Sequence, residues 1–207
     1  MKSIYKNKYY NVVQITSIPV SLGGKKPSGL GGVVLGLSEQ LKKDGKRVAV
    51  LARGLYFKKY KTKNGLEIFG LGFSLLSIIR TFVVLFKNKS KIKRLYTKMN
   101  FFKLVYAVYF MTYFINKISF DIVHLHHVVN QFPLAIKMLK IKMPVLAHIH
   151  SYTSVVLSSK ENQVKIVNNI NYMLSMVDYI LHVSNCEREQ GKQFGVKWHS
   201  QDQVIYN

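Results

Sequence analysis

A glycine-rich stretch at residues 21–45, SLGGKKPSGLGGVVLGLSEQLKKDG, is the first place where residue types and spacing indicate chemistry. It follows a β-branched run at residues 12–18 that is typical of a strand, and its second half repeats apolar residues at helical spacing. Glycines between a strand and a helix leave backbone N–H groups open to an anion, above all phosphate. An ordinary flexible loop is the alternative, because neither familiar phosphate-binding motif is present.

Six of the seven histidines lie in or just after predicted strands: His124, His126, His127, His148, His150 and His182. Ligands of doubly wound sheets bind at the carboxyl ends of the strands. His126 and His150 fall at such ends, where each could meet a substrate hydroxyl or phosphate. For any single histidine the alternative is a neutral, hydrogen-bonded core side chain. Because side chains alternate along a strand, we expect His124 and His126 to face one way and His127 the other.

The histidines also raise the question of a metal. Histidine is a common metal ligand, but no cysteine or carboxylate cluster accompanies these residues at a recognisable metal-binding spacing. The sequence therefore predicts no metal site. The single cysteine, Cys186, excludes an internal disulfide and is consistent with a reducing, cytoplasmic compartment. We expect its thiol to be buried.

The elements that must position these residues alternate in type along the chain. Strand-like runs occupy residues 12–18, 47–52, 66–69, 121–126, 144–150, 178–183 and 203–206, with a polar loop or hairpin at 58–64. Helical patterns occupy residues 33–41, 131–140, 163–176 and the stretch from 187 onward. Near-continuous apolar strands that alternate with helices predict an α/β fold with a doubly wound, mostly parallel sheet in one domain over residues 1–207.

The charge of the chain is strongly positive, with 31 Lys and Arg against nine Asp and Glu. No acidic residue lies between Glu67 and Asp121, an interval that includes a predicted basic and apolar helical insertion at about residues 74–118. Its central cations are Lys87, Lys89, Lys91, Lys93, Arg94 and Lys98. Such a field attracts an anionic membrane surface or nucleic acid.

The residues around these cations favour a membrane surface over nucleic acid as the partner. Apolar segments at residues 75–86 and 101–118 flank them, and no recognisable nucleic-acid module is present. Arg80 and Lys103 interrupt the two segments, so neither predicts a spanning helix. The two readings left open are helices that lie in a membrane interface with the cations on anionic head groups, and helices that pack on the sheet with the lysines simply solvated.

Five segments, in this order, resemble family 4 glycosyltransferases of the GT-B fold. Residues 28–51, SGLGGVVLGLSEQLKKDGKRVAVL, are similar to the opening glycine loop, helix and second strand. FDIVHLHH at 120–127 resembles the segment D-[IV]-[IV]-H-x-H, and PVLAHIH at 144–150 resembles the strand P-x-[IV]-x-T-x-H. VDYILHVS at 177–184 is similar to A-D-x-[IV]-[IV]-x-[VS]-S, and VIYN at 204–207 to the start of the hinge V-I-x-N-G-[VI]-D.

The resemblance implies a Rossmann-like N-terminal domain that binds the acceptor, while the C-terminal donor domain of the family is absent from this chain. Three roles follow from it residue by residue. His126 would act at the reacting sugar, and His150 would contact substrate. The groups near the donor diphosphate would be Lys26, Ser28, Gly29, Gly31 and Gly32. Ser28 stands where the family usually has the first glycine of a pair.

The function that the resemblance implies is a retaining glycosyltransferase that uses a nucleoside-diphosphate sugar, without a metal or other cofactor. Its setting would be bacterial cell-envelope or capsule polysaccharide or glycolipid synthesis, at the inner face of the cell membrane. The partners would be that anionic surface, a glycan or glycolipid acceptor, and a donor-binding half supplied by another chain. We expect the chain to be inactive alone. The alternative is a non-catalytic membrane-docking subunit that recruits a donor-binding partner.

Overall fold

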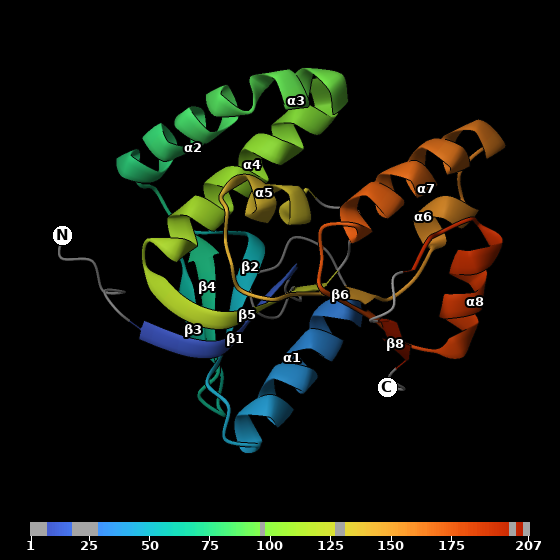
Figure 1. Ribbon diagram of the computed structural model, residues 1–207. Helices are drawn as coiled ribbons and strands as arrows, with labels where there is room; N and C mark the ends of the chain where they lie inside the picture. The colour runs from blue at the N-terminus through green and yellow to red at the C-terminus, as the bar shows by residue number, and fades with distance from the viewer. Residues whose placement is uncertain (1–7, 18–28, 96–97, 127–130, 199–201, 205–207) are drawn as a thin grey trace.

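The computed structural model describes residues 8–17, 29–95, 98–126, 131–198 and 202–204, and the side chains of these except at residues 91, 94, 95 and 98–100. Its centre is an eight-stranded sheet with helices on both faces (Figure 1). The strands are β1 Lys8–Ser17, β2 Val48–Tyr56, β3 Lys59–Lys61, β4 Glu67–Leu71, β5 Ile118–His126, β6 Val145–Ile149, β7 Tyr179–His182 and β8 Asp202–Val204. The helices are α1 Gly29–Lys43, α2 Leu75–Lys87, α3 Lys89–Leu95, α4 Lys98–Ile115, α5 Phe132–Met138, α6 Thr153–Val156, α7 Lys160–Leu174 and α8 Asn185–Gln193.

The strand order is β3-β4-β2-β1-β5-β6-β7-β8, and every neighbouring pair is parallel except β3 and β4. This confirms the predicted doubly wound, mostly parallel sheet. Strand β1 lies at the centre, with Val12 opposite Val48 of β2 on one side and Ile122 of β5 on the other. The chain builds outward from β1 first in one direction and then in the other, so the strand order reverses between β1 and β5.

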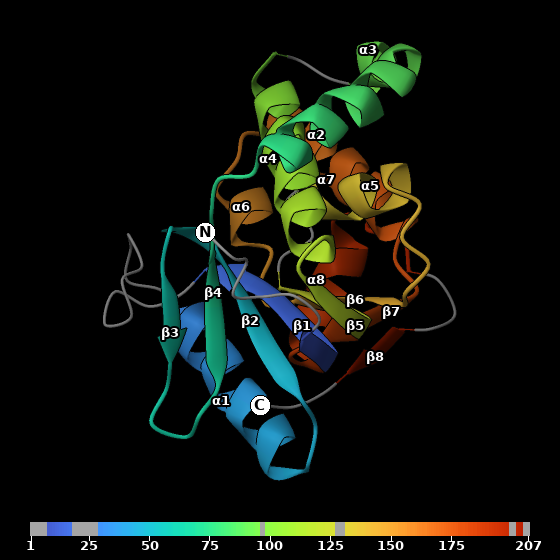
Figure 2. The same cartoon turned by 90° about the vertical axis from the view of Figure 1, so that its left-hand side faces the viewer.

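The two faces of the sheet have separate cores because the side chains of β1 alternate. Val13 and Ile15 belong to the larger core, which α4, α5 and α7 cover. Val12 belongs to a smaller core on the opposite face, where Leu35 and Leu41 of α1 contact β2. Figure 2 shows α1 on the other side of the sheet from α2, α4 and α5. Full burial of a side chain such as Val13 contributes about 1.5–3 kcal/mol to folding.

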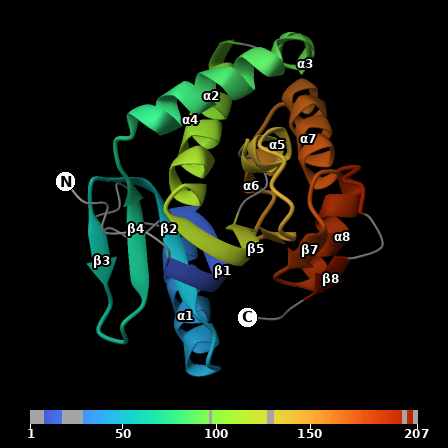
Figure 3. The same cartoon turned by 60° about the vertical axis from the view of Figure 1, so that its left-hand side comes forward.

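Helix α2 is amphipathic with its apolar face turned outward. Figure 3 shows α2 lying across α4, and the side chains that α2 buries are Ser77, Thr81 and Leu85. Both buried hydroxyls are satisfied: Thr81 Oγ1 donates to the Ser77 carbonyl at 2.7 Å, and Ser77 Oγ bonds the N-cap Ser74 at 3.0 Å and accepts from Asn116 at 3.4 Å. The outer face exposes large apolar side chains: Leu75, Leu76, Ile79, Phe82, Val83 and Phe86.

Several predicted bounds change in detail, among them the start of β1 at Lys8 rather than at residue 12, and one expectation is wrong. Strand β2 runs on to Tyr56, through Gly54 at φ 78°, rather than ending at residue 52. Helix α7 begins at Lys160, three residues before the predicted start. Cys186 is exposed rather than buried, because it lies at the start of α8, whose buried residue is Gly191. None of the helices in the described residues is both long enough and apolar enough to cross a membrane.

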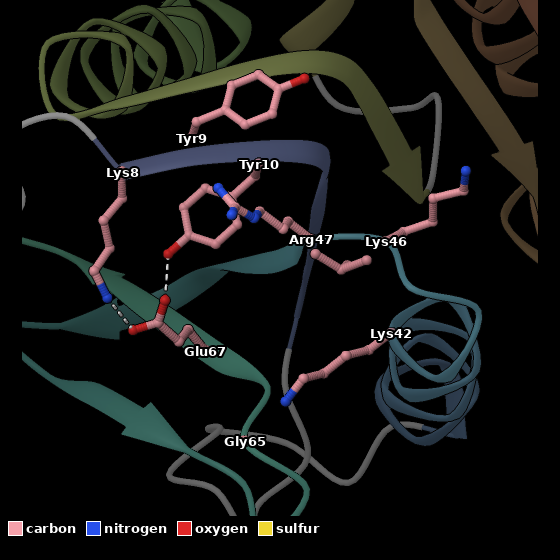
Figure 4. Close-up of a pocket in the computed structure, with 9 residues that line it drawn as sticks. Lys8, Tyr9, Tyr10, Lys42, Lys46, Arg47, Gly65 and Glu67 are labelled. Carbon is pink, nitrogen blue, oxygen red and sulfur yellow. Dashed lines mark hydrogen bonds and ion pairs between the residues drawn. The ribbon is translucent and has the colours of Figure 1, made fainter.

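Glu67 ties three strands together at the amino edge of the sheet. It pairs with Lys8 of β1 at 2.7 Å and accepts a hydrogen bond from the Tyr10 hydroxyl (Figure 4). It also pairs with Lys59 of β3 at 2.6 Å. Burial alone would raise the pKa of this carboxyl, but the hydrogen bonds from Lys59, Lys8 and Tyr10 outweigh it and lower the pKa to about 2. The adjoining 450 Å³ pocket lies at the edge where doubly wound sheets do not bind ligands.

Glu67→Gln should therefore lower the free energy of unfolding at pH 7 by about 1–3 kcal/mol. A carboxyl with a depressed folded-state pKa contributes its full stability above its unfolded pKa near 4.5 and loses it as the pH falls toward 2. The difference between variant and wild type in urea unfolding should thus shrink below pH 4.5. Glu161→Gln is the matched control, since that exposed pair with Lys165 should contribute under about 0.5 kcal/mol. A Glu67 difference that stays constant down to pH 2.5 would contradict the assignment.

Candidate functional site at the carboxyl edge of the sheet

The carboxyl ends of the parallel strands bring distant residues to one edge. Ser17 is in register with Arg53, and Ile15 with Leu125, the neighbour of His126. Helix α1 reaches the same edge with its first turn: its last residues lead through Arg47, whose carbonyl accepts from Asn11 N–H at 2.8 Å, into the start of β2. The end of α1 is thus at the amino edge and its beginning at the carboxyl edge. Gly29 and His126 lie at the same edge.

A row of four imidazoles lies on the α1 face of the sheet: three are buried in β5 and β6, and the fourth, His150, is half-buried directly after β6. The ring centroids are 4.1 Å apart for His124 and His126, 5.4 Å for His126 and His148, and 4.1 Å for His148 and His150. His124 and His126 share a face as expected, while His127 lies outside the described residues. Strand alternation and the register of His126 with His148 put the row together.

His126 is held by two hydrogen bonds. Its Nε2 lies 2.7 Å from Gln14 Oε1, on the neighbouring strand β1, and its Nδ1 lies 3.0 Å from His150 Nε2. An amide oxygen only accepts, so Nε2 of His126 carries a proton, and in the neutral ring Nδ1 then accepts from the His150 N–H. The structure therefore brings together the two histidines that the sequence singled out. It also fixes the tautomer and the ring orientation of His126.

His124 and His148 of this row are neutral at pH 7 and incompletely paired. Burial, followed by the charge of His150, lowers the pKa of His124 to about 3, and burial followed by the charges of His124 and His182 does the same for His148. Nε2 of His124 and both ring nitrogens of His148 have no hydrogen-bond partner among the described residues. Each unpaired buried group costs about 1–3 kcal/mol. Such local costs are typical of sites that bind a ligand.

The same three rings are the residues that could hold a metal. His124, His126 and His148 each offer a nitrogen, and these atoms lie within 4.8 Å of one another. Both nitrogens of His126 already bond Gln14 and His150. An ion bound by His126 would cost one of these bonds, and no carboxylate or cysteine joins the three rings in the described part of the chain. The arrangement fits a polar substrate group better than a cation, and the metal-free site stays a prediction.

Arg53 is a cation at this edge that the sequence reasoning missed. Its Nη2 donates to Ser17 Oγ at 3.2 Å, and its buried Nε has no partner among the described residues. Burial lowers its pKa, and the nearby Tyr106 hydroxyl opposes that shift. None of the ion pairs of the described residues includes Arg53. A half-buried guanidinium without a carboxylate presents a planar fork that suits phosphate.

Gln14 was missed as well. Both Gln14 and Arg53 carry a signal in the sequence, since each is a long polar side chain within or directly after an apolar strand run. This pattern predicts a polar side chain at the sheet, but it does not predict which residue that side chain contacts. Gln14 Nε2 also lacks a hydrogen-bond partner in the described residues, which adds to the unpaired groups beside His126.

The other predicted residues fall in two places. Lys26 and Ser28 lie outside the described residues. Gly29, Gly31 and Gly32 form the first turn of α1, where backbone N–H groups lack partners within the helix, and a Cβ at Gly32 would meet no described atom within 4 Å. The six cations of the insertion lie on α2, α3 and the start of α4. Lys87, Lys89 and Lys93 are exposed, and the side chains of Lys91, Arg94 and Lys98 are outside the described set.

Comparison with known proteins decides the family. The model of Glycosyltransferase Family 4 matches residues 27–207. The chain belongs to glycosyltransferase family 4. The prediction made from the five segments is thus confirmed. No curated protein matches this glycosyltransferase chain.

Solved structures show the same fold at low identity. Sucrose-phosphate synthase from Thermosynechococcus elongatus is 14% identical with a TM-score of 0.63, over 95% of this chain and 48% of that one. Anabaena HepE in complex with UDP-glucose is 13% identical with a TM-score of 0.52, over 95% and 43%. Trehalose-phosphate synthase from Burkholderia xenovorans in complex with glucose-6-phosphate is 10% identical with a TM-score of 0.52, over 87% and 42%. The chain has the N-terminal Rossmann-like half of the GT-B fold and spans less than half of each structure.

Acid should destabilise the glycosyltransferase domain through the imidazole row. A histidine with a folded pKa near 3 and an unfolded pKa near 6.5 binds its proton only when the chain unfolds, so stability falls as the pH drops from 6.5 toward 3. Each such residue should contribute a slope of about 1.4 kcal/mol per pH unit. Urea unfolding between pH 7.5 and 5 measures this slope, which His148→Gln should reduce by about one proton. Equal slopes for variant and wild type would show that His148 is not the neutral buried group.

Proposed function

We propose that this domain is the acceptor-binding part of a nucleotide-sugar-dependent glycosyltransferase. The observation that carries the proposal is the meeting of three features at one sheet edge: the first turn of α1, the oriented His126–His150 pair, and Arg53. The family match supports the reaction class. The unpaired imidazole and guanidinium nitrogens support an uncharged sugar ring beside an anionic group.

The mechanism follows from what these groups can do. Transfer from a nucleoside-diphosphate sugar places new negative charge on the leaving diphosphate. Backbone N–H groups and the positive end of the α1 dipole at Gly29–Gly32 stabilise that charge, and Lys26 adds a cation if its loop carries it there. With Nε2 held by Gln14, Nδ1 of His126 is the nitrogen that His150 would release, and it would accept a hydrogen bond from a sugar hydroxyl. In this proposal His126 orients the sugar and takes up a proton from it.

The donor contacts are proposed to need a second domain. The solved structures that this chain resembles are more than twice as long as the part it matches. HepE was solved with UDP-glucose and the Burkholderia enzyme with glucose-6-phosphate, which supports a UDP-sugar donor and a polar acceptor for the class. We expect transfer only when a donor-binding domain is present, whether on the same polypeptide or on another.

A second proposed function is docking to an anionic membrane surface, at the inner face of a bacterial cell membrane. The observation behind it is α2, which turns its apolar side chains outward, next to exposed Lys87, Lys89 and Lys93. Apolar side chains with flanking lysines suit the interface of an anionic bilayer. The acceptor would then be a cell-envelope or capsule glycan or glycolipid. A non-catalytic docking subunit would have the same surface as the transferase. The two functions differ in the transfer assay, where the docking subunit would show no transfer.

His126→Ala should lower the rate of transfer by roughly 10²- to 10⁴-fold if this ring assists at the reacting sugar. The assay combines the chain with a family 4 donor domain and a panel of UDP-sugars, and follows release of UDP. Lys165→Ala on the exposed face of α7 is the control, and thermal unfolding checks that both variants fold. Wild-type rates for His126→Ala would remove this residue from the site. No transfer by any combination would favour the docking subunit.

Sedimentation with lipid vesicles tests docking. The chain should sediment with phosphatidylglycerol vesicles and much less with phosphatidylcholine vesicles. Reversal of Lys87, Lys89 and Lys93 to Glu should weaken binding at least about 100-fold, since each cation near such a surface contributes about 1 kcal/mol. The matched control reverses three exposed lysines near α5: Lys137, Lys140 and Lys142. Equal binding to both lipids, or equal loss in the control, would contradict docking through the α2–α3 cations.

A further inference from the structure

Two apolar cavities form one track over α2 and α4. The larger, of about 890 Å³, lies between α2, α3 and α4, and Phe86, Ile92, Phe101 and Phe102 line it. The smaller, of about 380 Å³, lies between α2, α4 and the ends of β2 and β4. Phe82 and Val105 line both cavities, so the two adjoin. The lining is almost entirely apolar, which suits a hydrocarbon chain rather than a sugar.

The inner end of the track reaches the carboxyl edge of the sheet. Tyr56 and Leu71, the last residues of β2 and β4, are in register and line the smaller cavity. The Gly54 N–H donates to the Tyr106 hydroxyl of α4 at 3.4 Å, and Arg53 is the residue before it. Arg53 shares the α4 face of β2 with Ala49 and Leu51 of the larger core. Arg53 lines neither cavity, but it lies on this face of β2 near Tyr106, three residues before Tyr56 at the inner end of the track.

The apolar side chains of the track are exposed to water when no ligand is bound, and this exposure lowers the stability of the chain. Phe57, Phe82, Phe86 and Phe102 are 76%, 65%, 71% and 72% exposed. Phe57 also has a φ of 55°, a conformation that a bulky side chain rarely adopts. Strained residues and contiguous exposed apolar surface both concentrate where a protein binds a partner.

We propose that this track binds the hydrocarbon chain of an anionic lipid whose phosphate is bound by Arg53. The proposal rests on the proposed transferase function and names its acceptor class: a lipid phosphate, or a glycan carried on one. The guanidinium supplies the fork for the phosphate oxygens, and the aromatic side chains cover the chain. Lys87, Lys89 and Lys93 surround the outer end of the track, where they face the head groups of the bilayer from which the lipid comes.

The test uses a single lipid molecule rather than a membrane, so that docking does not enter. Decyl phosphate below its micelle concentration is titrated into the chain and followed by calorimetry. We expect saturable binding with one site per chain. Inorganic phosphate should bind at least 100-fold more weakly, because each methylene that leaves water raises affinity about fourfold. Decanol should bind about tenfold more weakly, because its neutral hydroxyl has neither the negative charge nor the paired oxygens that a phosphate offers to the guanidinium.

Two variants locate the chain and the phosphate. Phe82→Asp adds a charge at the junction of the two cavities and should lower affinity for decyl phosphate at least tenfold. Leu157→Asp is the matched control on an exposed apolar residue outside the track, and its affinity should equal that of wild type. Arg53→Gln should bring decyl phosphate down to the affinity of decanol, while Arg53→Lys retains part of the difference. Thermal unfolding of each variant shows whether it folds.

Any of four results would overturn the proposal. Absence of saturable binding by decyl phosphate would exclude the track as a lipid site, as would equal affinities for Phe82→Asp and wild type. Equal affinities for decyl phosphate and decanol would show that Arg53 does not bind the phosphate. A dimer that Phe82→Asp dissociates, in a chain that does not bind decyl phosphate, would show that a second copy covers the track. Transfer to a water-soluble sugar without lipid binding would support the transferase function and contradict the lipid site. Lipid binding without transfer would support the lipid site and contradict the transferase function.

Discussion

The hydrogen bond between Gln14 and His126 joins the two halves of the sheet at the point where the strand order reverses. Gln14 lies on β1 and His126 at the end of β5, 112 residues apart in the chain. Doubly wound sheets bind ligands outside the carboxyl ends of the two strands at such a reversal, because the connections leave in opposite directions and open a crevice. The orientation of His126, the neutral row behind it and the approach of α1 all depend on this parallel pairing of β1 with β5.

The two faces of the sheet bring different chemistry to that edge. On the α1 face, the first helical turn and the imidazole row lie at the same edge of the sheet. On the α4 face, Arg53 lies near Tyr106 of α4. Strand alternation separates the two faces along β1, where Gln14 faces one side and Ile15 the other. A ligand at the carboxyl edge could therefore have its anionic and sugar groups held by polar atoms of both faces while an apolar part follows α2 and α4.

The sequence was sufficient for the sheet and the family because both are encoded locally. Apolar runs such as residues 121–126 can only be buried on both faces, and the family segments are short and contiguous. Partners across the sheet were not predictable, since nothing local to Gln14 indicates His126. The orientation of α2 was not predictable either. Apolar periodicity normally indicates the buried face, yet here Ser77 and Thr81 face α4. Both hydroxyls are satisfied there: Thr81 bonds the Ser77 carbonyl, and Ser77 bonds the side chains of Ser74 and Asn116.

The site and the outward face of α2 each contain groups that lower the stability of the chain when no ligand is bound. The unpaired nitrogens of His124 and His148 and the exposed rings of Phe82 and Phe86 each lower stability, in a class of molecule with only about 5–15 kcal/mol in total. A ligand that binds only the folded state adds RT ln(1 + [L]/Kd) to that stability, about 2.7 kcal/mol at 100 times Kd. Substrate at the row and lipid on the track would each offset part of the cost. The free energy lost in the empty domain keeps the buried polar groups of the site desolvated and oriented before the ligand binds. Groups oriented in advance are the condition for electrostatic stabilisation of a leaving diphosphate.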